Sequence, residues 1–169
     1  MISIPVFIGI SERFKCIEGM TERSILENTS AQVDIVHLYP IVEEGCTGFS
    51  NVRYQIKHGI YLDCDMIVLG DIAELWAYRK SGKYVCMEDG ATEVAVIDCE
   101  GHSCRHKREL HKLPRSCDIP PEWNVEDIRT KGDVPHGTKL VHYTKLETQP
   151  WIHGPHPNPY LDALWRQYV

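Results

Sequence analysis

The feature that most constrains the fold of this chain is an apolar stretch interrupted by two carboxylates. Ile60-Tyr61-Leu62 leads directly into Asp63-Cys64-Asp65, and Met66-Ile67-Val68-Leu69 follows at once. Short apolar runs of this kind are typical of buried strands. Residues i and i+2 of a strand point to the same side, so Asp63 and Asp65 are expected to converge. Because open α/β sheets bind ligands at the carboxyl ends of their strands, the pair predicts a ligand site there.

The chemistry of two neighbouring carboxylates favours a bound cation. Two like charges in a half-buried place are unfavourable unless a cation or a proton lies between them. A hard divalent ion with oxygen ligands, Mn²⁺ or Mg²⁺, is the natural occupant. A solvated turn is the alternative interpretation, since Asp is common in turns. The apolar runs on both sides favour the functional one.

The other apolar runs predict a single α/β domain over residues 1–169, with a mixed central sheet flanked by helices. Strands are expected at 4–10, 33–38, 60–62, 66–69, 84–87, 94–97 and 139–143. Short helices are expected at 22–28, capped by Thr21, at 51–57, and at 72–76, capped by Asp71. An amphipathic C-terminal helix is predicted from Leu161, Leu164, Trp165 and Tyr168. Loops are expected at 42–50 and 150–159.

Composition narrows the class of protein. The chain has 169 residues, with 18 Lys and Arg against 24 Asp and Glu, and this net charge of −6 argues against a nucleic-acid partner. No apolar run approaches the roughly 20 residues that span a bilayer, so no transmembrane segment is expected. The N-terminus lacks the basic start of a signal peptide. Seven cysteines, an odd number, favour reduced thiols and a cytoplasmic location.

The segment 99–117 is rich in possible zinc ligands. These are Cys99, His102, Cys104, His106, His111 and Cys117. None of them forms a C-x-x-C pair, and their spacing matches no common zinc motif. A polar loop or helix with incidental thiols is therefore favoured over a zinc site.

Four segments, in order along the chain, resemble glycosyltransferase family 8 and its relatives, which are GT-A enzymes with a Rossmann-like fold that use nucleotide-sugar donors. The strongest is YLDCDMIVLGDIAELW at 61–76, which is similar to the family's D-x-D signature. FSNVRYQI at 49–56 resembles the arginine-bearing helix that precedes this signature, and IPPEWNVED at 119–127 resembles a tryptophan-asparagine segment. LVHYTKLETQPW at 140–151 is similar to the H-[YF]-T…PW segment near the family's C-terminus.

The resemblance implies a metal site. Asp63 and Asp65 match the family's metal-binding aspartates, with Cys64 between them at the donor site. His142 matches the third protein ligand, which supplies an imidazole nitrogen to Mn²⁺. Arg53 matches a basic residue near the metal carboxylates and the donor.

The resemblance also implies donor and acceptor contacts. Backbone groups of Ile8, Gly9, Ile10 and Ser11 are expected to face the nucleotide base. The family's diphosphate-binding lysine precedes the Pro-Trp pair, where this chain has Gln149, so the nearby Lys145 is the candidate cation. Glu122, Asn124 and Asp127 are candidates for sugar or acceptor contacts. Asp65, Arg53 and Asp127 are the candidate catalytic residues.

The predicted function is therefore metal-dependent transfer of a sugar, expected to be a hexose with retention, from a UDP-sugar donor. The acceptor is unknown and is a glycan, a protein or a lipid-linked molecule. The chain is short for the family, with nine residues between Arg53 and Asp63, and TEVAVIDCEG at 92–101 lacks the family's asparagine-small-glycine signature. One alternative is a domain that binds nucleotide sugars with little or no transferase activity. Another is a phosphatase of haloacid dehalogenase type, but Ile67 stands where that family has Thr or Val.

Overall fold

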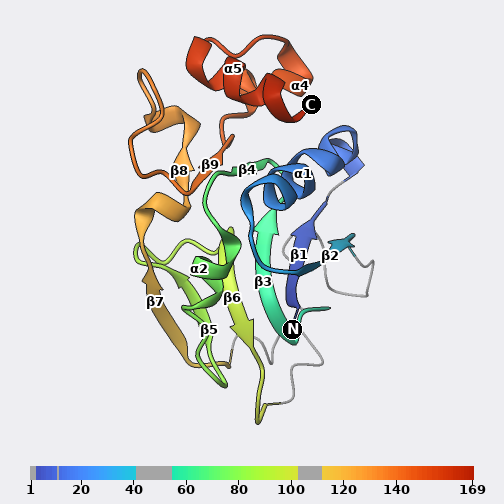
Figure 1. The fold of residues 1–169 in the computed structure, drawn as a ribbon, viewed down its shortest axis with the longest axis vertical. Coiled ribbons are helices and arrows are strands. Elements are labelled where there is room, and N and C mark those ends of the chain that lie inside the picture. The colour runs from blue at the N-terminus through green and yellow to red at the C-terminus, as the bar shows by residue number, and fades with distance from the viewer. Residues whose placement is uncertain (1–2, 11, 41–54, 103–111) are drawn as a thin grey trace.

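The computed structural model describes residues 3–10, 12–40, 55–102 and 112–169, and its centre is a mixed sheet (Figure 1). Six strands follow the order β2-β1-β3-β6-β5-β7. Their bounds are β1 Ile4–Gly9, β2 Val33–Leu38, β3 His58–Asp63, β5 Tyr84–Met87, β6 Val94–Asp98 and β7 Arg115–Ile119. Strand β1 pairs in parallel with β2 and β3, whereas β6 runs antiparallel to both β3 and β5, and β7 is parallel to β5. The mixed α/β sheet predicted from the sequence is confirmed.

A smaller sheet continues from the carboxyl end of β3. It contains β4 Met66–Val68, β9 Leu140–His142 and β8 Val125–Glu126, with β9 in the middle. Strand β9 is antiparallel to β4 and parallel to β8. The chain passes from the large sheet to the small one through Cys64 and Asp65, so this turn joins the two sheets.

The helices are short and lie beside the two sheets. They are α1 Glu18–Asn28, α2 Ile72–Trp76, α4 Pro150–His153 and α5 Pro159–Tyr168, with 3₁₀ helices η1 Glu12–Ile17, η3 Pro121–Trp123, η4 Asp127–Arg129 and η5 Leu146–Thr148. Helix α1 packs against β4 and α5, and α4 and α5 form the upper end of the molecule in Figure 1. Among the described residues, none of the helices combines the length and apolarity that crossing a bilayer requires.

The core lies on both faces of the large sheet and beneath the small one. On one face, Ile8, Ile60 and Leu62 are fully buried in the largest cluster, and on the other Tyr61 and Ile97 are fully buried. This alternation follows from the two-residue period of a strand. A third cluster joins the small sheet to the C-terminal helices, with Ile67, Val141, Tyr143, Leu161, Trp165 and Tyr168 buried together.

The start of α1 differs from the sequence prediction, whereas that of α2 agrees with it. Thr21 does not cap α1, because the helix begins at Glu18 and η1 leads into it without a side-chain cap. Asp71 caps α2 as predicted, since its Oδ1 accepts a hydrogen bond of 2.9 Å from the backbone N–H of Ala73.

Two elements were not predicted, and one expected helix cannot be compared. Strand β7 lies in the stretch that was expected to be a polar loop. Alternate residues of this sheet-edge strand face solvent, so its sequence lacks the apolar run that predicts a buried strand. Helix α4 lies in the segment expected to be irregular, where Pro150 occupies its first turn. Of the expected helix 51–57, residues 51–54 lie outside the described part of the chain, as do 42–50.

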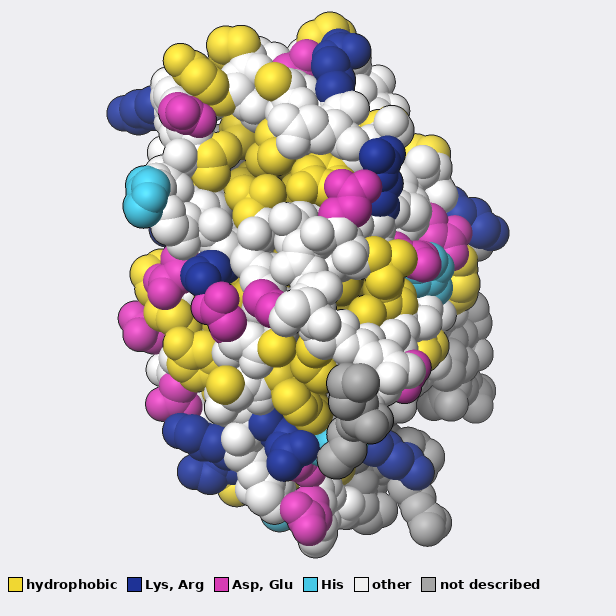
Figure 2. Space-filling model, viewed as in Figure 1, with side chains coloured by type: hydrophobic (Ala, Val, Ile, Leu, Met, Phe, Trp, Pro, Cys, Tyr) yellow, Lys and Arg dark blue, Asp and Glu magenta, His cyan; other side chains and the backbone are white. Residues whose placement is uncertain are grey.

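The cysteines and the surface charges complete the description. Cys16, Cys86 and Cys117 are free thiols, as expected, but Cys99 is disulfide-bonded. Cys104, His106 and His111 of the cysteine- and histidine-rich segment lie outside the described residues. On the face drawn in Figure 2, Lys and Arg side chains are interspersed with Asp and Glu.

Candidate metal centre

Three predicted ligands meet where β3, the following turn and β9 come together. Asp63, Asp65 and His142 each offer one ligand atom, and these atoms all lie within 4.8 Å of one another. His142 Nε2 is 3.1 Å from Asp65 Oδ1. Asp65 and His142 are 8 % and 5 % exposed, while Asp63 is partly exposed. Among the described residues, the ligand atoms of this group are close enough together to hold one cation.

Each carboxylate is positioned by its own neighbours. Asp63 is the last residue of β3, and the fully buried Tyr61, two residues earlier on the same side, donates its phenol hydrogen bond to Asp63 Oδ1. Asp65 lies in the turn between the two sheets, where its carbonyl accepts a 3.0 Å hydrogen bond from the backbone N–H of Tyr143. The main chain of β9 therefore fixes Asp65 beside His142.

Helix α1 contacts the same turn through the hydroxyl groups of two of its side chains. Thr21 Oγ1 is 2.8 Å from the carbonyl oxygen of Cys64 and 2.7 Å from that of Met66. One turn of helix later, Ser24 Oγ accepts a 2.9 Å hydrogen bond from the backbone N–H of Val68. These buried contacts satisfy backbone groups that water cannot reach.

His142 is oriented by a residue whose contact the sequence did not predict. The ring nitrogen Nδ1 lies 3.0 Å from Asn124 Oδ1. The amide oxygen of Asn124 accepts the Nδ1 proton, so Nε2 is the nitrogen that faces Asp65. A partner on the far ring nitrogen is the usual way in which proteins orient a metal-binding imidazole. Asn124 stands next to β8, and its role depends on β8 pairing with β9.

The charge around His142 is strongly negative. Burial is the largest single influence on its pKa and lowers it, but the hydrogen bond with Asp65 and the charges of Asp65, Asp63 and Glu93 raise the pKa above the ordinary value of histidine. Glu93 Oε2 is itself buried and has no hydrogen-bond partner in the described part of the chain. Since Leu62 pairs with Val94, Glu93 stands opposite Asp63 across β3 and β6. A divalent cation would balance this surplus of negative charge.

The end of β1 lies directly beside Asp63. Gly9 pairs with Asp63 across β1 and β3, and a Cβ at Gly9 would overlap the ring of Tyr61, whose Cε2 would lie 2.9 Å away. The absence of a side chain at Gly9 therefore leaves room for Tyr61 to reach Asp63. Ile8 and Ile10 are 0 % exposed as whole residues, and the backbone N–H of Ile10 donates a 2.8 Å hydrogen bond to the carbonyl of Leu38, so the expected nucleotide contacts of these residues stay a prediction.

Three further residues, Cys64, Ser11 and Arg53, were predicted to contact the nucleotide-sugar donor. Cys64 packs its side chain into the core, and its carbonyl lies against Thr21, so its side chain does not face the metal centre. Ser11 and Arg53 lie outside the described residues. Gln149, which stands where the family has a lysine, is 1 % exposed, and its Nε2 donates a 2.9 Å hydrogen bond to the carbonyl of Tyr143.

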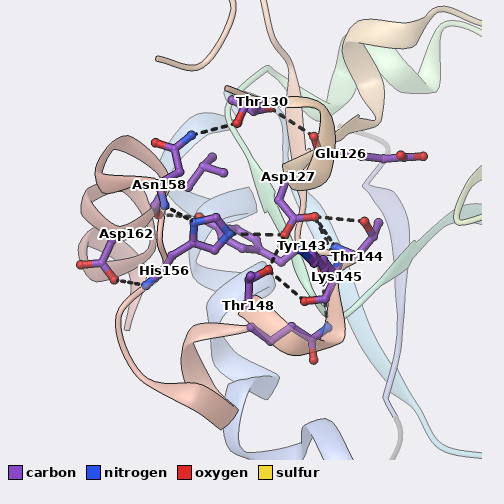
Figure 3. A network of polar contacts seen from close by, with 12 residues as sticks. Glu126, Asp127, Thr130, Tyr143, Thr144, Lys145, Thr148, His156, Asn158 and Asp162 are labelled. Carbon is purple, nitrogen blue, oxygen red and sulfur yellow. Dashed lines mark hydrogen bonds and ion pairs between the residues drawn. The ribbon is translucent and has the colours of Figure 1, made fainter. Parts of the chain in front are cut away.

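Asp127 lies at the centre of a separate polar network (Figure 3). Its side chain is 1 % exposed. Oδ1 accepts hydrogen bonds from Thr144 N at 2.9 Å, Thr144 Oγ1 at 3.0 Å and Lys145 N at 3.3 Å. Oδ2 lies 3.3 Å from Thr148 Oγ1 and 3.4 Å from His156 Nε2. Through these contacts Asp127 holds the segment after β9 in place, and its catalytic role stays a prediction.

Known structures share this fold, although no family model and no curated protein matches the sequence. The apo glycosyltransferase GlyE from Streptococcus pneumoniae TIGR4 has a TM-score of 0.66 at 14 % identity, covering 99 % of this chain and 60 % of that one. The bifunctional glycosyltransferase WbbM gives 0.61 at 13 % identity, covering 88 % and 47 %. The galactosyltransferase LgtC, in complex with donor and acceptor sugar analogues, gives 0.58 at 9 % identity, covering 98 % and 95 %.

The comparisons define the fold class. The chain has the GT-A-like α/β fold of these glycosyltransferases, as the sequence predicted. It spans 60 % of the length of GlyE. The narrower assignment to family 8 stays a prediction.

Proposed function

We propose that this protein is a metal-dependent glycosyltransferase that uses a nucleotide-sugar donor, with a UDP-sugar as the expected one. The observation that carries the proposal is the convergence of Asp63, Asp65 and His142 at the carboxyl end of β3, within a fold shared with glycosyltransferases. In α/β folds this edge of the sheet is where ligands bind.

The residues present fit a divalent cation. Two carboxylates and an imidazole suit Mn²⁺ and are compatible with Mg²⁺, and Asn124 already orients the imidazole. A bound cation would supply positive charge to the diphosphate as its bond to the sugar breaks. Because ligands must be deprotonated to bind a metal, Nε2 of His142 would have to carry no proton when a cation is bound.

The donor would lie across the ends of β1 and β3. Backbone groups of Ile8, Gly9 and Ile10 are proposed to contact the nucleotide, continuing to Ser11. Support comes from the pairing of Gly9 with Asp63, which places the end of β1 beside the metal centre. Arg53 and Lys145 are the proposed cationic contacts of the donor. Glu93, with its unpaired buried oxygen next to the centre, is a further candidate for a sugar hydroxyl.

The proposed transfer is of a hexose with retention. An acceptor hydroxyl oxygen forms a bond to the anomeric carbon on the face that the diphosphate leaves. The bond from that carbon to the diphosphate oxygen breaks, and the hydroxyl proton passes to the departing diphosphate.

A second candidate is a domain that binds nucleotide sugars with little or no turnover. Two observations favour it. The chain spans only 60 % of GlyE, and buried Gln149 takes the place of the family's diphosphate-binding lysine. Binding would then persist without transfer.

Thermal unfolding with UDP, with Mn²⁺ and with both tests the binding half of the proposal. A ligand of the folded state raises the apparent melting temperature. We expect UDP to stabilise the wild type only when Mn²⁺ is present, and Asp65→Asn to lose this effect. Asp34→Asn, an exposed carboxylate on β2, is the matched control and should behave as wild type. Failure of UDP to stabilise the wild type under any of these conditions would overturn the proposal.

Hydrolysis of UDP-glucose and UDP-galactose then separates the two candidates. Many transferases release the sugar to water slowly when no acceptor is present, so an enzyme should liberate UDP. Release by the wild type but not by Asp65→Asn supports the transferase. Binding without release supports the second candidate.

A further inference from the structure

Two cysteines face each other at one edge of the large sheet. Cys86 of β5 pairs with Cys117 of β7 in the parallel register, and their Sγ atoms lie 3.4 Å apart. Strand β7 is the last in the strand order and lies at one side of the sheet in Figure 1. Both cysteines are free thiols. The pairing of two strands therefore brings together two thiols that no local sequence motif connects.

The backbone spacing at this pair is compatible with a disulfide bond. Neighbouring strands lie about 4.8 Å apart, and the Cα atoms of disulfide-bonded cysteines are usually about 4.4–6.8 Å apart. The two Sγ atoms would have to approach from 3.4 Å to about 2.05 Å. Because Cys117 is exposed, its side chain is free to rotate toward Cys86. A small local movement would therefore bring the sulfurs to bonding distance.

Strand β7 can make this movement because of its place in the sheet. Within the described part of the chain it pairs with β5 alone. The register is irregular directly after the two cysteines, where Met87 pairs with Ile119 and Asp118 is the extra residue on β7. An extra residue of this kind disrupts the ladder of hydrogen bonds locally and bends the strand. The chain next to Cys117 is therefore less constrained than a central strand.

The two thiols differ in their access to solvent. Cys117 is exposed, whereas Cys86 is fully buried in the cluster that contains Tyr84 and Ile97. Burial, together with the hydrogen bond and the charge of Cys117, raises the pKa of Cys86 to about 11, although the charge of Arg115 acts in the opposite direction. The thiolate is the reactive form of cysteine. A reagent in solution should therefore react at Cys117, and Cys86 should react only with its neighbour.

We propose that Cys86 and Cys117 form a redox modification site, at which a small-molecule disulfide such as oxidised glutathione converts the two thiols into a disulfide between β5 and β7. The Cys117 thiolate attacks one sulfur of the external disulfide, which forms a mixed disulfide and releases one thiolate. The Cys86 thiol then gives its proton to water, and its sulfur attacks Cys117 Sγ and releases the second thiolate. Two protein thiols are oxidised, and one external disulfide is reduced to two thiols. This chemistry does not depend on the proposed transferase function.

The bond would fasten an edge strand that leads toward the metal centre. Ile119, the last residue of β7, is fully buried, and η3 follows it at Pro121–Trp123. Asn124, which contacts His142, comes directly after η3. A disulfide restricts the unfolded chain more than the folded one, because it closes a loop that the folded state has already closed. We therefore expect the oxidised protein to be more stable than the reduced one.

Peptide mapping after oxidation tests the proposal. The folded protein is treated with oxidised glutathione, the remaining thiols are blocked with N-ethylmaleimide in denaturant, and the peptides are analysed by mass spectrometry. We expect the peptides of Cys86 and Cys117 to be joined in the wild type and in Cys16→Ser, which removes another exposed thiol, but not in Cys117→Ser. A lasting glutathione adduct on Cys117 with Cys86 blocked by maleimide, or both cysteines blocked, would overturn the proposal. So would a bond from either of them to another cysteine.

Urea unfolding of the same samples measures the effect on stability. The wild type should unfold at a higher urea concentration after oxidation than before it, because the new bond restricts the unfolded chain. Cys117→Ser, which cannot form the bond, should unfold at the same urea concentration before and after treatment. A linked wild type whose midpoint does not rise would overturn the expected stabilisation of β7. An equal rise in Cys117→Ser would assign the effect to another cysteine and overturn it as well.

Discussion

Thr21 shows how much the metal centre depends on a single side chain outside it. The hydroxyl of Thr21 lies between the carbonyls of Cys64 and Met66, one on each side of Asp65. Because the hydroxyl has one proton to donate, its loss would leave one buried carbonyl without a donor, which costs about 1–3 kcal/mol. The same loss would loosen the turn that holds Asp65 next to His142.

We therefore predict that Thr21→Val lowers the free energy of unfolding by about 1–3 kcal/mol and weakens Mn²⁺ binding. Thr21→Ser retains the hydroxyl and should largely preserve the affinity for Mn²⁺. Urea unfolding and a Mn²⁺ titration of the three proteins would measure both effects. Equal Mn²⁺ affinity in wild type and Thr21→Val would show that α1 does not position the carboxylates.

Cys86 offers a test at the same scale but away from the centre. Burial, together with a hydrogen bond and the charge of the neighbouring Cys117 thiol, raises the pKa of Cys86 from 9.0 to about 11. The unfolded chain therefore ionises first as the pH rises. The stability that this thiol contributes is fully present below pH 9.0 and is lost as the pH approaches about 11.

The expected result is that wild-type protein loses more stability than Cys86→Ala between neutral pH and about pH 10. Urea unfolding at the two pH values measures the difference. Parallel losses in the two proteins would show that the thiol titrates in the folded state as it does in the unfolded one.

Among the elements, α5 is the one that closes the core beneath the small sheet. Leu161 is fully buried in the cluster with Val141 and Tyr143, and the Tyr143 hydroxyl donates a 2.8 Å hydrogen bond to the Leu161 carbonyl. Leu164 lies on the same helix but is only partly buried. The helix thus packs against β9 and stabilises the strand that carries His142.

Truncation of these two leucines should therefore have unequal effects. Leu161→Ala removes fully buried methyl groups and should cost about 2–5 kcal/mol of unfolding free energy. Leu164→Ala should cost clearly less, because its side chain is already partly in water. Chemical denaturation of both variants gives the comparison, and equal costs would contradict the docking of α5 described above.

The elements also show what the sequence could predict. Nearly continuous apolar runs identified β5 and β6, because strands buried on both faces leave that pattern. Strand β7 was not predicted, because its exposed and partly buried residues alternate at the edge of the sheet. Helix α4 was not predicted, because proline is common both in loops and at the starts of helices. The contact of Asn124 with His142 forms only when β8 pairs with β9, so no local sequence pattern predicts it.

For the whole molecule, the metal centre brings together residues from distant parts of the chain. The sequence predicted that Asp63 and Asp65 would form a site, since they are neighbours after a strand. A family resemblance predicted His142 as a metal ligand. The pairing of β4 with β9 at the junction of the two sheets places its side chain close to Asp63 and Asp65. The surrounding charge of Glu93 likewise depends on the pairing of β3 with β6. The fold therefore brings a third candidate ligand, His142, to the two aspartates, which spacing alone did not predict.

The most direct test of the central claim is electron paramagnetic resonance of Mn²⁺ titrated with the protein in the presence of UDP. Bound Mn²⁺ loses the sharp signal of the free ion, so the titration counts occupied sites. We predict one site in the wild type, none in Asp65→Asn or His142→Ala, and one in Asp34→Asn. Equal Mn²⁺ binding by all four proteins, or none by the wild type, would contradict a metal centre formed by Asp63, Asp65 and His142.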